Sequence, residues 1–414
     1  MIMTEQKSVV IIGAGAAGLA AAVKLSQYGI RDIIILERED TPGGILRQCI
    51  HDGFGIVRFN ERLSGPEYAE RFISKAEELD IEIITKAAVI DISKDKKVTV
   101  VTREGLKKYT AKAIVLAMGC RERTRGALGI PGVRTAGIFT AGVMQAYVNL
   151  YNLMPAKNVI ILGSGDIGLI MARRLTLEGC KVHAVIEKLP YPGGLPRNVQ
   201  QCLNDFDIPL YLNHTVVDIE GDSRVESVTV GTLNEGGNVI NKSLRKYPCD
   251  TLVLSVGLIP ENELSKLAGI ELDPKTGGPI VDEHYQTSVK GIFAAGNVLH
   301  VHDLVDYVSI EAEKLASSVA RYIRAGELQK CTIRLVTGNG ISSIVPQRVS
   351  GTGDADIFIR FSKPDRDKNI LFKQHGNVIQ KEFRQILNPP EMAAVTLEKA
   401  AFRLICDIEA EVEI

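Results

Sequence analysis

Hydrophobic residues near the start of the chain form a continuous run, then a periodic stretch, then a second continuous run. Residues 9–37 read VVIIGAGAAGLAAAVKLSQYGIRDIIILE. The four apolar, mostly β-branched residues at the start predict a buried strand, and LAAAVKLSQYG after the glycines predicts a helix. The segment DIIILE predicts the next buried strand. A strand, a helix and a strand in this order form the unit from which parallel sheets are built.

The same pattern returns in the middle of the chain. Residues 158–187 read NVIILGSGDIGLIMARRLTLEGCKVHAVIE, again an apolar strand, glycines, a helix and a second strand. Two complete units of this kind predict an α/β fold with two Rossmann-like dinucleotide-binding domains.

Other segments alternate apolar and polar residues, as half-buried strands do. IEIITKAAVIDISKDKKVTVVT (81–102) and YLNHTVVDIEGDSRVESVTVGTL (211–233) contain such strands around the turn residues SKDK and EGDS. Within residues 329–414, DADIFIRF, NILFKQHGNVIQKEF and AFRLICDIEAEVEI alternate in the same way. We therefore predict a small β-rich C-terminal domain at 329–414.

Three glycines follow the first strand with the spacing G-x-G-x-x-G. Gly13 permits a tight turn, Gly15 lets the backbone approach a pyrophosphate, and Gly18 lets the helix pack on the strand. Glu37 ends the second strand, where an acid can accept a hydrogen bond from a ribose hydroxyl. Strand, glycines, helix and acid together favour a dinucleotide site over a glycine-rich packing turn.

The second unit repeats each of these features. Gly163, Gly165 and Gly168 have the same spacing, and Glu187 ends the second strand. An acid at that strand end favours NAD, whereas an arginine would favour the 2′-phosphate of NADP. Lys188 follows directly, but the acid leads us to expect NAD(H) rather than NADP(H).

Composition narrows the class of protein. The formal net charge is -1 and no run of lysine and arginine occurs, so we expect no nucleic-acid partner. Glycines break the longest apolar run, which predicts no membrane span. The N-terminal residues lack the pattern of a signal peptide, and we expect a cytoplasmic protein.

The cysteines are widely spaced. No CxxC or Cx4C pattern occurs, which argues against a sequence-local zinc site, iron–sulfur site or redox disulfide. We therefore predict no metal site and reduced thiols. The seven cysteines are at positions 49, 120, 180, 202, 249, 331 and 406.

Five motifs in order give the chain a family resemblance. The two glycine units, AIVLAMGCRERTR (113–125), DTLVLSVGLIPENE (250–263) and GIFAAGNV (291–298) resemble the pyridine nucleotide–disulfide oxidoreductases, a family of flavoproteins with two dinucleotide sites. The resemblance implies an FAD-binding domain at 1–125 and 259–328, interrupted by an NAD-binding domain at 126–258. It implies hydride transfer between NAD(H) and FAD, in which the protein orients the two rings.

The resemblance also implies particular cofactor-binding positions. The late motif usually carries an aspartate where this chain has Asn297, so one charge beside the FAD is missing. An amide still donates and accepts hydrogen bonds, and FAD binding should survive. For FAD the positions are Gly13, Gly15, Ala16, Ala17, Gly18, Glu37, Arg38, Gly44, Ile45, Ala88, Val89, Met118, Gly119, Gly296 and Asn297. For NAD they are Gly163, Gly165, Asp166, Ile167, Gly168, Glu187 and Gly257.

The stretch GGILRQCIHDGFG (43–55) occupies the place where disulfide reductases of this family carry a cysteine pair, yet it holds Cys49 alone. Dithiol chemistry is therefore not expected. As candidate catalytic residues, Cys49 could act as a flavin-contacting or peroxide-reactive thiol, and His51 as a proton donor to reduced flavin. The alternative is that both only line the FAD pocket.

Three residues after the late motif are expected by topology to lie as near the flavin as Cys49 and His51 do. These are His300, His302 and Asp303. A helix beginning near residue 305 would favour negative charge on reduced flavin, while Asp303 and Asp306 would oppose it.

A closer resemblance concerns function. RLSGPEYAERF, YPGGLPRNVQQCLND, GNVLHVHDLVDYVS and NPPEMAAVTLE are similar to segments of FAD/NAD subunits from multi-subunit amino-acid, opine and glycerol-3-phosphate dehydrogenases. This implies an NAD-side component of an oligomer that also contains a small iron–sulfur protein and a partner flavoprotein dehydrogenase subunit. Glycerol 3-phosphate, oxidised at the partner, is our first expectation for the substrate. The C-terminal domain would be an interface, or else a lid on the FAD domain.

Two other functions remain open from the sequence. One is a self-contained NAD(P)H oxidase or disulfide reductase that uses Cys49. The other is a non-catalytic nucleotide-binding regulator.

Overall fold

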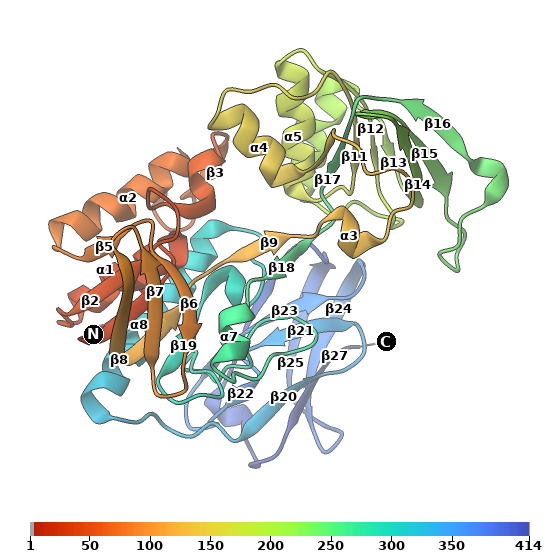
Figure 1. Ribbon diagram of the computed structural model, residues 1–414. Helices are drawn as coiled ribbons and strands as arrows, with labels where there is room; N and C mark the ends of the chain where they lie inside the picture. The colour runs from red at the N-terminus through yellow and green to blue at the C-terminus, as the bar shows by residue number, and fades with distance from the viewer. Residues whose placement is uncertain (1–3, 414) are drawn as a thin grey trace. The chain divides into compact units, whose positions relative to one another are not determined.

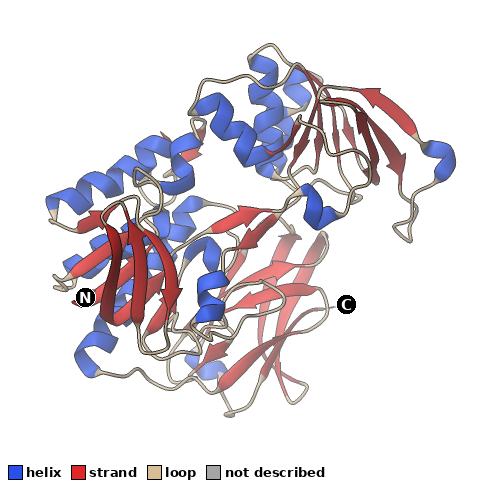
Figure 2. Ribbon diagram, in the orientation of Figure 1, coloured by secondary structure: helices blue, strands red, loops and turns tan. Residues whose placement is uncertain are grey.

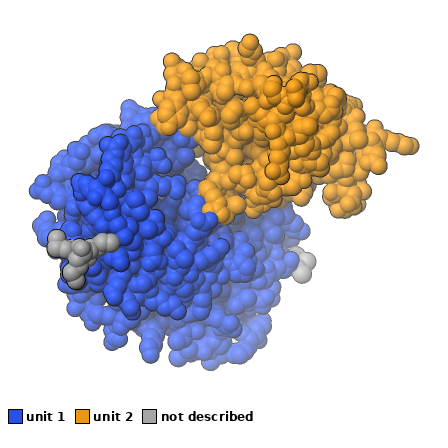
Figure 3. Space-filling view, viewed as in Figure 1, with its two compact units in different colours: residues 1–120, 260–414 blue, residues 121–259 orange. Residues whose placement is uncertain are grey.

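The computed structural model describes residues 4–413 of the chain. These fold into two compact units (Figure 3), one formed by residues 1–120 with 260–414 and the other by residues 121–259. The two crossings pair as a short sheet of β9 (Cys120–Glu122) and β18 (Leu258–Pro260). The middle of the chain is thus inserted into the first unit. The functional boundaries that we assigned to the three domains remain predictions.

The first unit is built on a seven-stranded sheet in the order β5-β2-β1-β8-β7-β6, with β19 also paired to β8. Strand β8 is long enough to pair with β7 through residues 105–110 and with β19 through residues 114–116. Its parallel part supports the predicted dinucleotide site. The strands are β1 (Thr4–Ile12), β2 (Ile33–Leu36), β5 (Glu82–Ile84), β6 (Ala88–Ile92), β7 (Lys97–Thr102), β8 (Gly105–Leu116) and β19 (Ile292–Ala294).

Helices pack on this sheet mainly through buried apolar residues. Figure 1 shows α1 (Ala16–Gln27), α2 (Gly65–Glu78) and α8 (Val305–Ala325) beside it, and α1 packs against both other helices. Ser64 begins α2 with a capping box, accepting from Glu67 N while Glu67 accepts from Ser64 N. The predicted helix start at 305 is confirmed. Shorter elements are η1 (Gly44–Gln48), β3 (Asp52–Phe54), β4 (Leu63–Ser64), α7 (Glu263–Leu267) and η4 (Gly296–Val298).

The second unit repeats the parallel arrangement. Its five-stranded sheet has the order β10-β17-β11-β12-β13, and a separate antiparallel sheet has the order β14-β15-β16. Its strands are β10 (Ile138–Thr140), β11 (Asn158–Leu162), β12 (Lys181–Ile186), β13 (Leu210–Tyr211), β14 (His214–Gly221), β15 (Val225–Thr232), β16 (Arg245–Pro248) and β17 (Thr251–Leu254). Its helical segments are α3 (Arg125–Leu128), α4 (Ala141–Asn149), α5 (Asp166–Leu177), α6 (Pro196–Cys202), η2 (Asn204–Phe206) and η3 (Asn241–Ser243). The predicted α/β class with two Rossmann-like sheets is confirmed.

The regular structure of the C-terminal region is strand apart from one short helix, and loops join the strands (Figure 2), so the β-rich prediction is confirmed. Two sheets, β22-β20-β27-β24-β25 and β21-β23-β26, enclose their own apolar core. The elements are β20 (Ile333–Thr337), β21 (Ile341–Val345), β22 (Arg348–Val349), β23 (Ala355–Phe361), β24 (Asp365–Gln374), β25 (Asn377–Leu387), β26 (Ala393–Leu397), η5 (Lys399–Ala401) and β27 (Ile408–Val412).

One strand prediction in this region needs correction. AFRLICDIEAEVEI is a strand only from Ile408, because residues 402–407 form a loop whose carbonyls at Leu404 and Cys406 accept from the Gln374 side chain. NILFKQHGNVIQKEF forms strands, as predicted, and these are the two arms of a hairpin, because His375 and Gly376 adopt positive φ and reverse the chain.

The C-terminal region is tied to the rest of the first unit by polar contacts. Arg360 donates to Val301 O at 2.9 Å, and Lys314 on α8 pairs with Asp356 at 2.6 Å. Ser350 donates to Glu283 at 2.6 Å. Removal of the C-terminal region would therefore take these partners away from Val301 O, Lys314 and Glu283. Among the described helices, none is long and apolar enough to span a membrane.

Candidate functional site

The first glycine loop requires glycine at two positions for steric reasons. Gly13 has φ of +103°, and a Cβ there would lie 2.5 Å from Ala117 O. A Cβ at Gly18 would lie 1.9 Å from Gly13 O. The turn and the close contact between α1 and the loop are those that a dinucleotide-binding unit needs.

Gly15 differs from Gly13 and Gly18, because no protein atom limits the space for a side chain there. A Cβ at Gly15 would meet nothing within 4 Å. Gly15 is also the N-cap of α1 and provides no side-chain cap, so the N–H groups of the first turn, at Ala16 and Ala17, face that open side. An anionic diphosphate fits this position, since helix N-termini with unpaired N–H groups bind phosphate.

Glu37 is buried directly after β2, and its two oxygens accept hydrogen bonds from two different segments. Ala14 N donates to Oε2 at 2.7 Å, and Glu39 N donates to Oε1 at 2.9 Å. The acid therefore fixes the loop as well as ending the strand. Arg38 beside it is exposed.

The segment after this strand returns to the glycine loop. Gly43 N donates to Ala14 O at 2.8 Å, and a Cβ at Gly44 would lie 3.1 Å from the Gly15 Cα. Ile45 is 62% exposed. The structure thus brings Gly44 and Gly15, two of the predicted FAD positions, together.

The remaining predicted FAD positions lie around the same sheet. Ala88 and Val89 begin β6, and Met118 and Gly119 follow β8. A Cβ at Gly296 would lie 2.9 Å from the Ala17 Cβ, which places the late motif against the start of α1. Two motifs 279 positions apart (17 to 296) therefore meet at one site.

The second glycine loop is held by a residue that sequence analysis missed. A Cβ at Gly163 would lie 2.0 Å from Ser255 O, and a Cβ at Gly168 would lie 2.5 Å from the Ser255 Cβ. The Ser255 hydroxyl accepts from Gly168 N at 3.0 Å. Ser255 follows β17, next to β11 in the sheet but remote in sequence, so no local pattern marks it.

Glu187 repeats the geometry of Glu37. Its Oε2 accepts from Ser164 N at 2.9 Å and from the Ser164 hydroxyl at 2.5 Å, and its Oε1 accepts from Leu189 N at 2.9 Å. Lys188 is exposed beside it. In both units the acid ties the residue after the first glycine of the loop to the residue two positions after the acid.

A segment that covers the second loop was also missed. Gly193 N donates to the Ser164 hydroxyl at 2.7 Å, and Asp166 accepts from Leu195 N at 2.8 Å and from Asn198 Nδ2 at 2.6 Å. The sequence did carry a signal, since Pro-Gly-Gly occurs at 42–44 and again at 192–194, offset by 150 positions as the glycine motifs are (13 to 163).

The last two predicted NAD positions lie in the same unit. Ile167 follows Asp166 in the first turn of α5 and packs against the apolar core beneath it. Gly257 has φ of +100° and accepts from Arg123 N at 3.0 Å.

Cys49 ends the short helix η1. Its thiol donates to Ile45 O at 3.4 Å, and its carbonyl accepts from Gly65 N at the start of α2. Desolvation raises the pKa of Cys49 to about 12, so the thiol is protonated at neutral pH. All seven cysteines are thiols, and the His51 ring packs 5.0 Å from that of Phe54. The geometry favours a packing role for Cys49.

We expect Cys49→Ser to retain its FAD and most of its flavin reduction by NADH. Because the pKa is raised, the thiolate should form only as pH approaches 12, and iodoacetamide should alkylate Cys49 slowly at pH 7 to 9. Peptide mapping after timed alkylation measures this, with the half-buried loop residue Cys406 as the internal comparison. Rapid alkylation of Cys49 at pH 7, with loss of flavin reduction, would contradict the expectation.

A buried polar cluster follows the late motif, formed by Asn297, His300, His302 and Glu311. Glu311 Oε1 accepts from Gly296 N at 2.7 Å, and its Oε2 lies 2.8 Å from His300 Nε2 and 3.4 Å from His302 Nε2. Although burial raises it, the pKa of Glu311 lies well below its usual range because of the two imidazoles. Burial, with His302 and Arg360 nearby, lowers the pKa of His300 to about 4.

Asp306 at the start of α8 has a local structural role. Its carboxylate accepts from the backbone N–H groups of Gly55, Val57 and Arg58 at 2.7 to 3.1 Å. These donors offset its charge, so its opposition to negative charge near the helix start is weaker than the sequence suggested.

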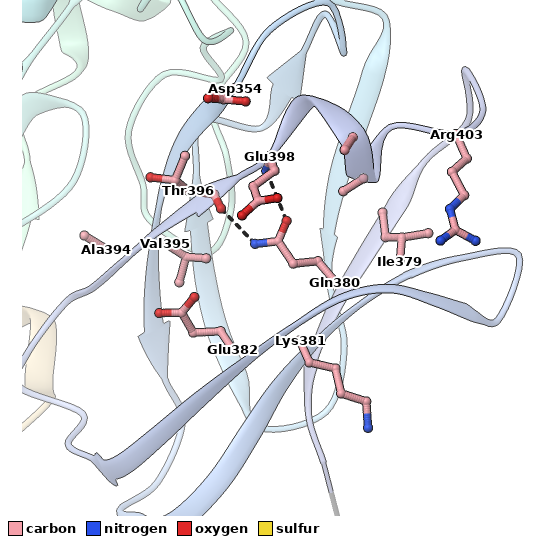
Figure 4. A pocket seen from close by; sticks show the side chains of 12 residues that line it. Asp354, Ile379, Gln380, Lys381, Glu382, Ala394, Val395, Thr396, Glu398 and Arg403 are labelled. Carbon is pink, nitrogen blue, oxygen red and sulfur yellow. Dashed lines mark hydrogen bonds between the residues drawn. The ribbon is translucent and has the colours of Figure 1, made fainter.

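A cavity of about 720 Å³ lies in the C-terminal region, between the edges of β25 and β26 (Figure 4). The Gln380 amide crosses it, donating to Thr396 O at 2.8 Å and accepting from Glu398 N at 3.0 Å. None of the predicted nucleotide-binding residues lines this cavity.

Comparison with protein families gives a match over most of the chain. Residues 7–320 match the family described as pyridine nucleotide-disulphide oxidoreductase. The match includes both glycine loops and the late motif, and it ends before β20.

Individual relatives cover the same part of the chain. A ferredoxin–NADP reductase of Picrophilus torridus is 24% identical over 331 residues, which are 77% of this chain and 95% of that protein. A subunit of opine oxidase from Agrobacterium tumefaciens is 26% identical over 322 residues, which are 71% of this chain and 62% of that protein. The crystal structure of T. acidophilum thioredoxin reductase has a TM-score of 0.64 at 26% identity, covering 77% of this chain and 98% of the other.

Proposed function

Because this chain belongs to the pyridine nucleotide-disulphide oxidoreductase family, we propose that it transfers hydride between NAD(H) and FAD as one subunit of a larger dehydrogenase. The family makes it an FAD-dependent pyridine nucleotide oxidoreductase. When bound, FAD supplies the acceptor for a hydride, and the protein supplies binding, orientation and electrostatics.

We assign FAD to the first unit and the nicotinamide nucleotide to the second. The single observation that carries the proposal is the pair of glycine loops with matching geometry in separate units. Gly15 and Gly165 are both helix N-caps without a side-chain cap, and each loop is fixed by a buried acid at the end of the second strand. The late motif contacts the first loop, at Ala17, and belongs to the same compact unit. This contact supports FAD in the first unit.

The proposed preference for NADH rests on Glu187, because an acid at the end of the second strand of such a unit favours NAD over the 2′-phosphate of NADP. We expect the apparent dissociation constant of NADH in anaerobic flavin reduction to be at least about tenfold below that of NADPH, or about 1.4 kcal/mol. Stopped-flow titration with both nucleotides measures it. Tighter binding of NADPH would contradict the assignment and direct attention to Lys188 or Arg197.

A partner protein is the next part of the proposal. Burial raises the pKa of the Cys49 thiol, which disfavours thiolate chemistry at neutral pH, and the stretch 43–55 holds no second cysteine, so we propose an electron acceptor in another protein. One relative, from opine oxidase, is by name one subunit of an enzyme. The edge strand β25 also exposes large apolar side chains, with Phe383 61% and Ile386 59% exposed. Exposed apolar residues on an edge strand favour contact with another chain.

We therefore propose that a small iron–sulfur protein completes the complex and that β25 contacts the partner flavoprotein subunit. Glycerol 3-phosphate, oxidised at the partner, is the first substrate to test. In the isolated protein NADH should reduce the flavin quickly, while turnover with oxygen or disulfides stays slow.

The test is coupled turnover with the two partner proteins and glycerol 3-phosphate. We expect Phe383→Glu to lower coupled turnover at least about tenfold, because a charge on the contact surface costs on the order of 1.4 kcal/mol or more. Leu267→Glu is the matched control, since Leu267 on α7 is 60% exposed and lies outside β25. Both variants should keep NADH-driven flavin reduction.

Two results would overturn the subunit proposal, and a third would overturn the assignment of its interface to β25. Turnover of a small molecule by the isolated chain at about ten per second would indicate a self-contained oxidase. A flavin that stays oxidised with NADH would indicate a nucleotide-binding regulator. Equal coupled activity of Phe383→Glu and Leu267→Glu would remove β25 from the interface.

A further inference from the structure

The cluster after the late motif determines which nitrogen of His302 can change its protonation. Asn297 Oδ1 accepts from the His302 backbone N at 3.0 Å. A backbone N–H can only donate, so this bond fixes the orientation of the Asn297 amide. The same oxygen lies 3.3 Å from His302 Nδ1. Since an amide oxygen can only accept, Nδ1 carries a hydrogen, and Nε2 is the nitrogen that gains or loses a proton.

His302 Nε2 faces a carboxylate without a hydrogen bond to it. It lies 3.4 Å from Glu311 Oε2 and has no hydrogen-bond partner among the described residues. The His302 side chain is 3% exposed and that of Glu311 is 0% exposed. A lone pair that faces a buried carboxylate is repelled, whereas a protonated nitrogen is attracted. The site is therefore built to take up a positive charge at Nε2.

The groups around His302 come from three elements. Glu311 projects from α8, His300 and Asp303 belong to the loop between η4 and α8, and Arg360 projects from β23. The His300 ring lies 4.1 Å from that of His302, and its lowered pKa of about 4 keeps it neutral. Asp303 pairs with Arg360 at 3.9 Å, and burial raises the pKa of Asp303. Asp303 is therefore the second group in the cluster that could take a proton.

The cluster is continuous with the late motif. Glu311 accepts from Gly296 N, and His302 is bonded to Asn297. Gly296 in turn contacts Ala17 in the first glycine loop. A charge that appears on the flavin of the first unit would thus act on His302 through a buried, weakly screened region.

We propose that His302 takes up one proton at Nε2 when the FAD of the first unit is reduced. This inference rests on the proposed function, because it needs FAD in that unit. Two electrons and one proton reduce the flavin to its anionic form, and the second proton comes from solvent to His302. The imidazolium between Glu311 and Asn297 then offsets the negative charge of the reduced flavin. His302 is a positioning residue for charge and does not take part in hydride transfer.

The test is the pH dependence of the flavin midpoint potential in the FAD-loaded chain, measured with mediator dyes and without NADH. For a two-electron couple the potential falls by about 30 mV per pH unit for each proton taken up. The range is limited to pH values at which reduced flavin is anionic. We expect two protons, or about 59 mV per pH unit, in the natural chain. His302→Gln should take up one.

Two matched variants locate the proton. His284→Gln changes another buried histidine of the first unit, which lies 3.9 Å from Glu283 and 3.3 Å from Arg321, and should leave two protons. Asp303→Asn removes the other candidate acceptor and should also leave two. The FAD content of each variant, measured by absorbance, shows that the site is intact. If His302→Gln loses FAD, the natural chain still tests the inference, because uptake of only one proton on reduction would contradict it.

Several outcomes would overturn the inference. One proton in the natural chain, two in His302→Gln, or loss of the second proton in Asp303→Asn would each do so. Finding one tightly held divalent ion per chain in the natural protein, and none in His302→Gln, would also overturn it. The cluster would then be a metal site and not a proton acceptor. Failure of NADH to reduce the flavin, with two protons still observed, would refute the proposed function alone. A chain that binds no FAD would overturn both.

Discussion

Gly15→Val is expected to yield a folded chain without bound FAD. A Cβ at this position meets no protein atom within 4 Å, and φ of −81° suits any residue, so the substitution should cost the fold little. The added side chain would instead fill the open side of the α1 N-terminus, where the diphosphate approaches. We expect at least about a hundredfold weaker FAD binding, or about 2.8 kcal/mol.

The measurement is the ratio of flavin absorbance to protein absorbance after purification, together with the thermal unfolding midpoint of the apoprotein. Gly13→Val is an instructive contrast, because its side chain would collide with Ala117 O at 2.5 Å and should destabilise the fold itself. Full FAD content in Gly15→Val would show that the flavin binds elsewhere.

Gly165→Val is expected to keep FAD and to lose reduction by NADH. The site lies in the second unit, at the N-cap of α5, and a Cβ there would lie 3.2 Å from the Ser255 hydroxyl. The side chain would block the nucleotide diphosphate and displace Ser255, which accepts from Gly168 N. We expect the rate of flavin reduction by NADH to fall at least about a hundredfold.

Anaerobic stopped-flow measurement with NADH tests this, and photoreduction of the same sample serves as the control. Photoreduction should remain normal, because the flavin in the first unit is unaffected. Loss of FAD from Gly165→Val, with retention in Gly15→Val, would reverse the assignment of the two units.

The C-terminal region illustrates how the structure changes the design of an experiment. From the sequence, residues 329–414 could be deleted as an independent module. In the structure Arg360 donates to Val301 O beside His302, and Asp356 pairs with Lys314 on α8. Deletion would therefore remove contacts to α8 and to the loop that follows the late motif. Surface substitutions on β25 test the interface without this defect.

The sequence by itself determined those features that depend on local pattern. The two strand–glycine–helix–strand units, the β-rich segments and the start of α8 at Val305 follow from apolar runs, alternation and the steric freedom of glycine. The Gly13 and Gly163 turns could be predicted because a positive φ leaves few other residues possible. The lack of a close cysteine pair was likewise visible in the spacing.

Only the tertiary structure decided which remote polar groups meet. Ser255 reaches the second glycine loop because β17 lies beside β11, and Glu311 reaches His302 because α8 folds back over the late motif. The loop at 402–407 is held out of β27 by the Gln374 side chain. The physical reason is common to all three. Buried polar groups must find partners, and the partner is chosen by which chain segments pack together, not by their distance in sequence.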